Sequence, residues 1–237
     1  MILGDLCTRR CTFCAIPRGR PQKPEANEPA RVTEATRRLK LSHVVITSVA
    51  RDDLLDGGAS QFAKVILSLH QKLPEVTVEV LTPDFKGDTD AIQKIVLAGP
   101  EVYNHNLETV ARLQRRLRPY ARYERSLGLL RHVKKLSPRI WTKSGLMVGI
   151  GEKEEEVIQT MRDLREVDCE MLTIGQYLQS DACNLPVVEF VTPEKFRHYE
   201  EIAYTLKFSY VFSGPFVRSS YLADGAKVEI ARPRKLT

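Results

Sequence analysis

The chain has 237 residues, of which 43% are hydrophobic and 28% are charged. This is the composition of a folded globular protein with one large domain or two small ones, and it excludes an intrinsically disordered chain. No apolar stretch reaches the roughly 18–20 residues of a membrane-spanning helix, and the first residues lack the basic and apolar regions of a secretion signal.

Seven short segments have the composition of buried β-strands, and amphipathic stretches lie between them. Apolar residues repeat at helical spacing from Phe62 to Leu69. They do so again behind the acidic run at 154–156, and again after Thr192-Pro193, a plausible helix cap. The predicted strands are 2–6, 43–48, 76–80, 101–104, 142–147, 171–175 and 210–212.

This alternation predicts an α/β fold with a parallel sheet and helices outside it. Six or seven units favour a partial (β/α)6-type TIM barrel, with chemistry at the carboxyl ends of the strands. We assign residues 1–224 to this barrel domain and 225–237 to a C-terminal tail. The first predicted strand begins at residue 2, so we expect Met1 to be an internal methionine of a longer protein or an early truncation.

The net charge is +6, and the basic excess is concentrated in residues 112–139, which hold ten Lys or Arg residues and one acid, Glu124. Two interpretations stay open: a solvated helix face, or a docking surface for an acidic partner. We find no nucleic-acid-binding module and no aromatic stacking positions beside the charge. An acidic protein is therefore the favoured partner, and neither nucleic acid nor a membrane is expected.

Three of the five cysteines, Cys7, Cys11 and Cys14, form a C-x3-C-x2-C cluster. An odd number of cysteines, three of them this close, indicates a reducing compartment and metal-binding thiolates. Three thiolates can hold three corners of a [4Fe–4S] cluster and leave one iron open, whereas ordinary electron-transfer clusters take four. Zinc would need a fourth ligand and usually a second pair. Unrelated thiols are the third alternative, and we favour the cluster.

The loop Cys7-Thr-Arg-Arg-Cys-Thr-Phe-Cys14 resembles that of the radical S-adenosylmethionine (radical SAM) enzymes. In that superfamily the amino and carboxylate groups of S-adenosylmethionine chelate the open iron. Cleavage of the sulfonium then releases a 5′-deoxyadenosyl radical. Phe13 matches the aromatic position that packs near the adenine, with simple core packing as the alternative.

Further motifs follow in order along the chain: Gly19-Arg-Pro21, Arg51-Asp-Asp-Leu54, Pro83-Asp-Phe85, Asn104-His-Asn-Leu-Glu108, Thr142-Lys-Ser-Gly-Leu-Met147, Gly175-Gln-Tyr-Leu178 and Arg218-Ser-Ser-Tyr221. This ordered set is similar to the lipoyl synthase family. The resemblance implies a sulfurtransferase that inserts sulfur at C6 and C8 of an octanoyl chain on a lipoyl carrier domain. It implies an acidic, octanoylated carrier and an electron donor as partners. The expected location is the cytoplasm, or an organelle matrix if the source is eukaryotic.

The resemblance also implies roles for single residues. Cys7, Cys11 and Cys14 would hold the first cluster, while Ser220 would ligate an iron of a second cluster, with Ser219 as the fallback. Candidate contacts to S-adenosylmethionine are Asn106, Glu108 and Lys143, with Thr47, Asp84 and His105 as weaker choices; polar packing is the alternative for each.

One part of the family pattern is missing from these residues. The family holds its second cluster with three more cysteines, spaced C-x4-C-x5-C before the first strand, and the 237 residues contain no such segment. Cys169 and Cys183 do not match those ligands. We therefore expect either a fragment of a lipoyl synthase or a diverged member that binds one cluster and cleaves S-adenosylmethionine without donating sulfur. The alternatives are a single-cluster radical SAM enzyme of other specificity and a non-catalytic metal-binding or carrier-docking remnant.

Overall fold

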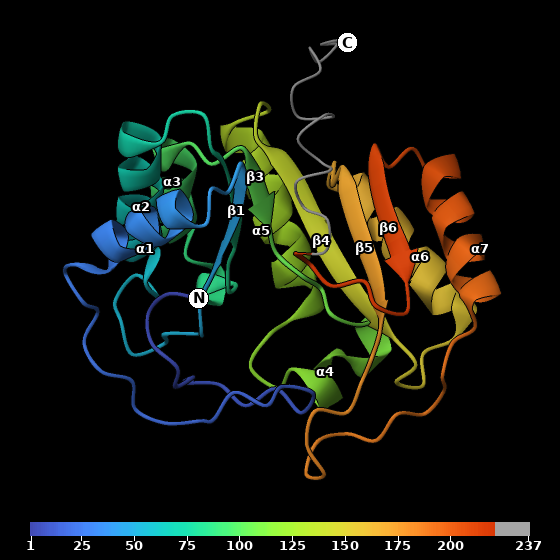
Figure 1. Cartoon of the computed structure of the whole chain (residues 1–237). Helices are drawn as coiled ribbons and strands as arrows, with labels where there is room; N and C mark the ends of the chain where they lie inside the picture. The colour runs from blue at the N-terminus through green and yellow to red at the C-terminus, as the bar shows by residue number, and fades with distance from the viewer. Residues whose placement is uncertain (221–237) are drawn as a thin grey trace.

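Six strands form a single parallel sheet in the computed structural model, which describes residues 1–220. The tail predicted at 225–237, and Tyr221, lie outside the described residues. The strand order follows the chain, from β1 to β6, and the helices cover the outer face of the curved sheet (Figure 1). This confirms the predicted α/β partial barrel. The strands are β1 (His43–Thr47), β2 (Thr77–Leu81), β3 (Val102–Asn104), β4 (Trp141–Val148), β5 (Met171–Gln176) and β6 (Tyr210–Gly214).

Three helices form where the apolar spacing predicts them, over 62–69, 157–164 and 199–206. The Thr192 side chain accepts a hydrogen bond from the Lys195 N–H and so caps the start of α7 (Pro193–Thr205), as predicted. In α2 (Ala59–Lys72), the side chains of Phe62 and Leu69 are completely buried against the sheet. The helices are α1 (Glu28–Arg38), α2 (Ala59–Lys72), α3 (Thr89–Ala98), α4 (Gln114–Leu117), α5 (Tyr123–Leu136), α6 (Glu154–Glu166) and α7 (Pro193–Thr205), with short 3-10 turns at Phe85–Gly87 and Ala111–Leu113. None of these helices is long and apolar enough to cross a membrane.

The strands alternate between an apolar outer face and a mixed inner face. Because successive side chains of a strand point to opposite sides, Val78 and Val80 of β2 join the core under the helices while Glu79 points inward. The first inward residues of β3, β4 and β5 form a separate apolar cluster, with Tyr210 of β6 packed against it. This cluster fills the amino-terminal end of the barrel at β3, β4 and β5, and the small inward residues Gly145 and Thr173 lie farther along their strands, toward the carboxyl end.

The strand predicted at 2–6 is wrong. Only Ile2 pairs with the sheet, through an isolated parallel bridge to Ser48 just beyond β1. The next two residues, Leu3 and Gly4, have positive φ angles of 68° and 91°, which turn the chain away from the strand direction. The cysteine loop therefore starts from one bridge and not from a full strand.

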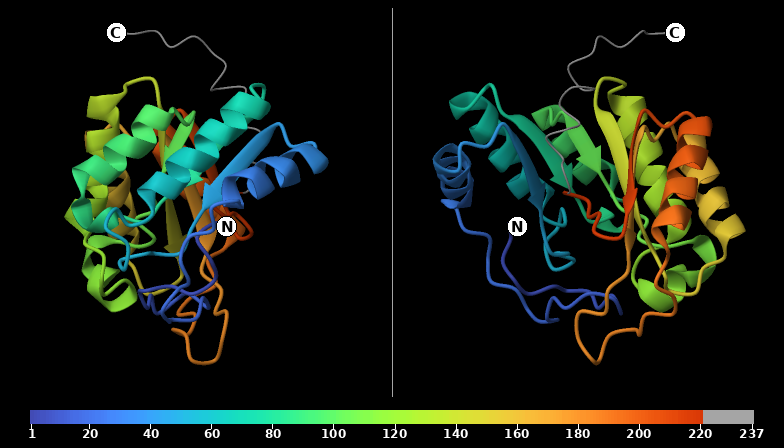
Figure 2. Two further views of the ribbon diagram at one scale, coloured as in Figure 1. Left: turned by 90° about the vertical axis from the view of Figure 1, so that its left-hand side faces the viewer. Right: turned by 45° about the vertical axis from the view of Figure 1, so that its right-hand side comes forward.

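The loops at the carboxyl ends of the strands gather on one side of the sheet. Figures 1 and 2 show the N-terminal segment and the loop between β5 and α7 crossing there beside α4. The Thr12 N–H donates to the Leu117 carbonyl at 2.9 Å, and the Leu185 N–H donates to the Thr12 carbonyl at 3.2 Å. The cysteine loop is thus tied to segments more than 100 residues away, which is the placement that the barrel rule predicts.

Candidate functional site

Backbone hydrogen bonds shape the loop that carries the three cysteines. The Cys7 N–H donates to the Pro17 carbonyl at 3.0 Å, and the Gly19 N–H donates to the Cys7 carbonyl at 3.1 Å. Within the loop, the Cys14 N–H donates to the Cys11 carbonyl at 3.2 Å. Cys7 and Cys11 are half-buried and Cys14 is exposed. The loop therefore folds back on itself and presents its thiols at the carboxyl end of the barrel.

The charges around Cys11 show which groups lie near one another. Burial raises the pKa of the Cys11 thiol, the Arg118 guanidinium lowers it, and the negative charges of Glu108, Cys14 and Cys7 raise it, for a net value of about 11. Burial also raises the pKa of Cys14, where Cys7 and Glu108 again contribute. The three thiols are thus coupled to each other and to one carboxylate.

This donor set fits an iron–sulfur cluster. The raised pKa values of Cys11 and Cys14 mean that these thiols hold their protons without metal and release them on binding it, because iron binds the thiolate. Among residues 1–220, no three His, Cys, Asp or Glu side chains are grouped closely enough to hold a single metal ion. The thiolates of a cuboidal cluster each bind a different iron, so they stand farther apart than the ligands of one ion.

A cavity with about 520 Å³ of empty volume opens at the carboxyl ends of β4 and β5. Its floor is made by small inward residues: a Cβ added to Gly145 would lie 2.8 Å from Asn106 Oδ1 and 2.8 Å from Thr173 Oγ1. Asn106 Oδ1 is buried and has no hydrogen-bond partner in the part of the chain that the structure describes. A donor on a bound molecule could satisfy it, so this cavity fits a polar cofactor.

Glu108 lines the same cavity and has an unusual backbone. Its φ of 68° lies in the left-handed region, which is uncommon for a residue other than glycine. Two backbone bonds to β4 hold it there: its N–H donates to the Gly145 carbonyl, and its carbonyl accepts from the Met147 N–H, both at 2.9 Å. Burial raises the pKa of Glu108, while Arg118 and Asn106 oppose that shift. The structure therefore brings the predicted residues Asn106 and Glu108 together beside the thiols.

Lys143 pairs with a carboxylate inside the barrel. It is buried inside the barrel, with Nζ 2.9 Å from Glu79 Oε1 and 2.7 Å from the Ser219 carbonyl oxygen. Glu79 also accepts from Asn104 Nδ2 at 3.0 Å and lies 3.3 Å from His43 Nε2. The contacts of Lys143 in this structure are therefore to the barrel and the C-terminal segment.

The other predicted residues are distributed around the site. Phe13 is half-buried and packs against the apolar core, and Thr47 ends β1 without lining the cavity. Ser220 is exposed at the end of the described residues, while the neighbouring Ser219 hydroxyl accepts from Asn106 Nδ2 at 2.7 Å. The C-terminal serines thus come to the cavity, and the one in contact with a predicted cofactor residue is Ser219.

A second cavity lies along the solvent side of the cysteine loop. Cys11 and Cys14 line it together with Arg10 and Arg18, and Cys183 comes to it from the loop between β5 and α7. Cys169, in contrast, is completely buried next to β5. Cys169 therefore lies away from the site, whereas Cys183 lies beside it.

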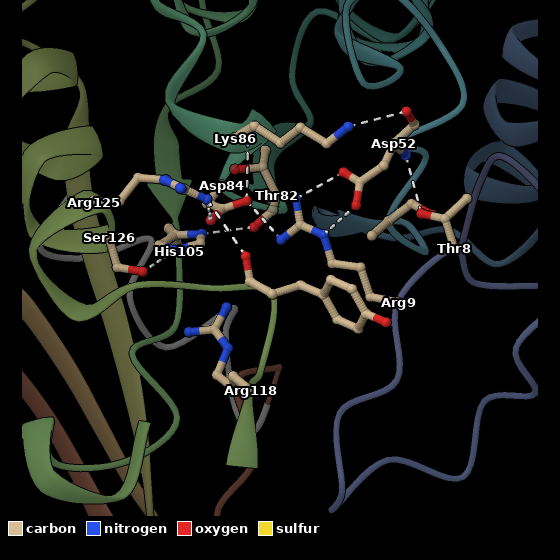
Figure 3. A network of polar contacts seen from close by, with 12 residues as sticks. Thr8, Arg9, Asp52, Thr82, Asp84, Lys86, His105, Arg118, Arg125 and Ser126 are labelled. Carbon is tan, nitrogen blue, oxygen red and sulfur yellow. Dashed lines mark hydrogen bonds and ion pairs between the residues drawn. The ribbon is translucent and has the colours of Figure 1, made fainter. Parts of the chain in front are cut away.

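Arg9 is a functional candidate that the sequence interpretation missed. Its guanidinium lies between Asp52, beyond β1, and Asp84, beyond β2 (Figure 3). Two signals could have pointed to it: a second basic residue inside the cysteine motif, and aspartates at the ends of two neighbouring strands. His105 lies next to this network, where it bonds to the Thr82 carbonyl and to Ser126.

The basic region at 112–139 is divided between the fold and the surface. Arg112 pairs with Glu156, and Lys134 pairs with Glu170. Arg118 is buried, where it donates to the Asn106 carbonyl oxygen. Besides Arg112, the exposed members are Arg115, Arg116, Arg122, Arg131, Lys135 and Arg139. Part of the positive charge therefore stabilises the barrel, and the rest faces solvent.

Solved structures with a similar fold include several radical SAM proteins. Streptococcus suis SuiB bound to S-adenosylmethionine has a TM-score of 0.68 at 10% identity, over 90% of this chain and 48% of that one. Methylornithine synthase has a TM-score of 0.63 at 13% identity, over 92% of this chain and 72% of that one. At these identities the likeness shows the fold.

Sequence comparison defines the family. The radical SAM superfamily model matches residues 1–164. A lipoyl synthase of Caldanaerobacter subterraneus subsp. tengcongensis is 61% identical over 224 residues, which cover 94% of this chain and 78% of that protein. The Rubrobacter xylanophilus lipoyl synthase is 53% identical over 94% of this chain and 70% of its own length. The chain belongs to the lipoyl synthase family of radical SAM enzymes.

Proposed function

We propose that this chain carries the radical-generating site of a sulfurtransferase that inserts sulfur at C6 and C8 of an octanoyl chain carried by a lipoyl carrier domain. The inserted sulfur would come from a second iron–sulfur cluster, for which these 237 residues contain no C-x4-C-x5-C ligand set. The observation that carries the proposal is the three-thiol loop beside a cavity lined by Asn106 and Glu108. The chain that contains this loop and cavity is 61% identical to a lipoyl synthase over 94% of the chain's own length. Aliphatic C–H bonds are too strong for acid–base side chains, so the reaction needs a radical cofactor.

In this proposal Cys7, Cys11 and Cys14 hold one [4Fe–4S] cluster, and the cavity binds S-adenosylmethionine. Together these groups supply a carbon radical that removes hydrogen from an unactivated carbon. The protein residues bind and orient S-adenosylmethionine. The Asn106 amide oxygen accepts a hydrogen bond, and the Glu108 carboxylate offers a negative charge to an amine or hydroxyl of the cofactor.

Iron counting tests this assignment. The 237 residues contain three clustered thiols, so anaerobic reconstitution should give roughly four irons per chain. With a strong reductant, the loaded protein should convert S-adenosylmethionine to 5′-deoxyadenosine. The Cys11→Ala variant should lose both properties, with Cys169→Ala as the matched control. About eight irons per chain would contradict the single-cluster assignment, and a colourless protein would contradict the cluster itself.

Product analysis separates lipoyl synthesis from other radical chemistry. Lipoyl product on an octanoylated carrier domain identifies the sulfurtransferase. 5′-Deoxyadenosine without any change in the octanoyl chain identifies a radical SAM enzyme that does not donate sulfur under these conditions. Absence of both identifies a module without turnover.

The proposed partners are an acidic, octanoylated carrier domain and an electron donor. Exposed Arg115 and Arg116 lie on α4, whose Leu117 carbonyl accepts a hydrogen bond from Thr12 of the cysteine loop. Positive charge beside the site attracts an acidic partner and raises its rate of encounter. The five free thiols are stable in a reducing compartment, and the proposal places the enzyme in the cytoplasm or an organelle matrix.

A further inference from the structure

The side chain of Arg9 joins the cysteine loop to the ends of two strands. Its Nε and Nη2 atoms lie 2.7 and 2.8 Å from the two carboxylate oxygens of Asp52. Its third nitrogen, Nη1, lies 2.6 Å from Asp84 Oδ1. Figure 3 shows the guanidinium between these two carboxylates. All three nitrogens of one planar group are used, which only arginine can provide.

The centre of this ion-pair network is buried, and its two carboxylates face two guanidinium groups. The Arg9 side chain is 6% exposed and that of Asp84 is fully buried. Arg125 approaches Asp84 from α5 at 3.1 Å, so two guanidinium groups face two carboxylates. Burial raises the pKa of Asp84, but Arg9 and the other contacts more than offset this and hold it below its ordinary value. Removing one member of such a buried set leaves an unpaired charge, which is costly.

The residue next to Arg9 is anchored in the same place. The Thr8 N–H and hydroxyl both donate to the Ala50 carbonyl, at 3.1 and 2.9 Å. The Thr8 hydroxyl oxygen in turn accepts from the Asp52 N–H at 3.0 Å. Arg10, one position further on, is exposed. Two of the three residues between the first two cysteines are therefore used to attach the loop to the barrel.

We propose that Arg9 is a positioning residue that holds the cysteine loop in its cluster-binding conformation before iron arrives, by bridging Asp52 and Asp84. A surface loop without this anchor samples many conformations, and metal binding must then order it. A loop fixed in advance binds its cofactor without that cost. The inference rests on the cluster site proposed above, and it concerns the protein without iron, so the two can fail separately.

Thiol alkylation of the iron-free 237-residue chain tests the anchor directly. Iodoacetamide modification is followed at each cysteine by mass spectrometry, with exposed Cys183 and buried Cys169 as internal references. Arg9→Gln should raise the modification rates of Cys7 and Cys11 roughly tenfold, through local opening of the loop. Cys183 should keep its rate, and Cys169 should stay protected because the barrel remains folded.

Two further variants separate geometry from charge. Arg10→Gln removes a neighbouring positive charge that is exposed, and it should leave the rates of Cys7 and Cys11 unchanged. Arg9→Lys keeps the charge, but its three N–H groups sit on one nitrogen, which cannot pair with both oxygens of Asp52 and also reach Asp84. It should therefore restore less than half of the lost protection. Full restoration by lysine, or equal effects at Arg9 and Arg10, would overturn the proposal.

Cluster retention provides a second readout. After reconstitution, iron should leave Arg9→Gln faster than wild-type protein in the presence of a chelator, and the electron paramagnetic resonance signal of the reduced cluster should broaden as the thiolates take several arrangements. Iron binding by the wild type tests the proposed function, whereas the rates in iron-free protein test the anchor. Unchanged thiol rates in Arg9→Gln would contradict the anchor even if the wild type binds iron.

A milder variant keeps the proposal testable if Arg9→Gln unfolds. Exposure of Cys169 would reveal such global unfolding. Asp52→Asn leaves the contact between Arg9 and Asp84 in place, and it should raise the rates of Cys7 and Cys11 by a smaller factor while Cys169 stays protected. Wild-type rates in this variant would overturn the proposal.

Discussion

Glu79 shows how single buried charges are tolerated inside this barrel. Burial raises its pKa, but Lys143, followed by hydrogen bonds from His43 and Asn104, more than offsets this and holds the pKa below its ordinary value. The carboxylate therefore stays charged and paired. Since Lys143 also donates to the Ser219 carbonyl oxygen at 2.7 Å, the same ion pair holds the C-terminal segment against the cavity.

Lys143→Met should therefore be strongly destabilising. It leaves Glu79 buried without its cation, and breaking a buried pair from one side costs about 3–5 kcal/mol. The free energy of unfolding, measured by urea denaturation, should fall by that amount. Arg197→Met is the control, because the pair of Arg197 with Glu194 on α7 is exposed and should contribute less than about 1 kcal/mol. Equal losses in the two variants would contradict this account of Glu79.

His105 makes stability depend on pH. Burial lowers its pKa from 6.5 to about 4, with the Arg118 charge acting in the same direction. A folded-state pKa below the unfolded value means that the unfolded chain takes up the proton first. The contribution of this residue is complete above pH 6.5 and is lost as pH falls toward 4. Stability should fall by up to about 1.4 kcal/mol per pH unit there.

Urea denaturation at a series of pH values measures this slope. His105→Gln removes the titrating group, and it should flatten the curve between pH 6.5 and pH 4. The slope below that window, which comes from paired carboxylates such as Asp84, should remain. A slope unchanged between wild type and variant would show that other groups cause it.

At the scale of elements, small inward residues on β4 and β5 create the cavity. A Cβ on Gly145 would lie 2.8 Å from Asn106 Oδ1, and a Cβ on Gly175 would lie 2.2 Å from the Val217 carbonyl oxygen. The first glycine leaves the cavity open, and the second allows the C-terminal segment to approach β5. Larger residues at these two positions would fill the space at the carboxyl ends of β4 and β5.

Gly145→Ala should weaken S-adenosylmethionine binding. The added methyl group crowds Asn106 and Thr173, and overpacking of this kind costs about 1–3 kcal/mol. The KM for S-adenosylmethionine cleavage should rise roughly tenfold, while far-ultraviolet circular dichroism stays unchanged. Gly128→Ala is the matched control: a Cβ at Gly128 on α5 meets nothing within 4 Å, and the substitution should stabilise the helix by up to about 1 kcal/mol. A KM that does not change in Gly145→Ala would place the cofactor elsewhere.

The sequence predicted six of the strands because each is a short apolar run between helical patterns. It failed at residues 2–6, where the apolar composition resembles a strand but Leu3 and Gly4 adopt positive φ angles. The Arg9 network could not be predicted from local pattern, since its partner Asp52 is 43 residues away and the pairing depends on strand order. Asn106 and Glu108 were predicted as a pair by resemblance. The left-handed backbone of Glu108 could not be predicted, because a glutamate does not ordinarily adopt a positive φ angle.

At the scale of the whole molecule, part of the exposed positive charge lies on the side of the cysteine loop. Arg115 and Arg116 are exposed on α4, and Arg10 and Arg18 line the outer cavity beside Cys14. Attraction between exposed charges is screened within about 8–10 Å at physiological salt. Carrier binding through this surface should therefore be sensitive to ionic strength.

The dissociation constant for an acidic octanoylated carrier domain should rise steeply between roughly 50 and 300 mM salt. Reversing the charges with Arg115→Glu and Arg116→Glu should weaken binding and reduce the salt dependence. Lys72→Glu, at the end of α2 and away from the cysteine loop, is the control and should leave both unchanged. Isothermal titration calorimetry at several salt concentrations checks this, and binding indifferent to salt would show that another feature recruits the carrier.

Within residues 1–220, β1 and β6 each pair with a strand on one side only, apart from the bridge to Ile2. A closed barrel can change its diameter only by breaking ladder hydrogen bonds, because every strand is held on both sides. An unclosed sheet can flatten or tighten its curvature with every such bond intact. The width of the interior is therefore set by the side chains and loops that pack inside it, and not by a closed ring of ladder hydrogen bonds.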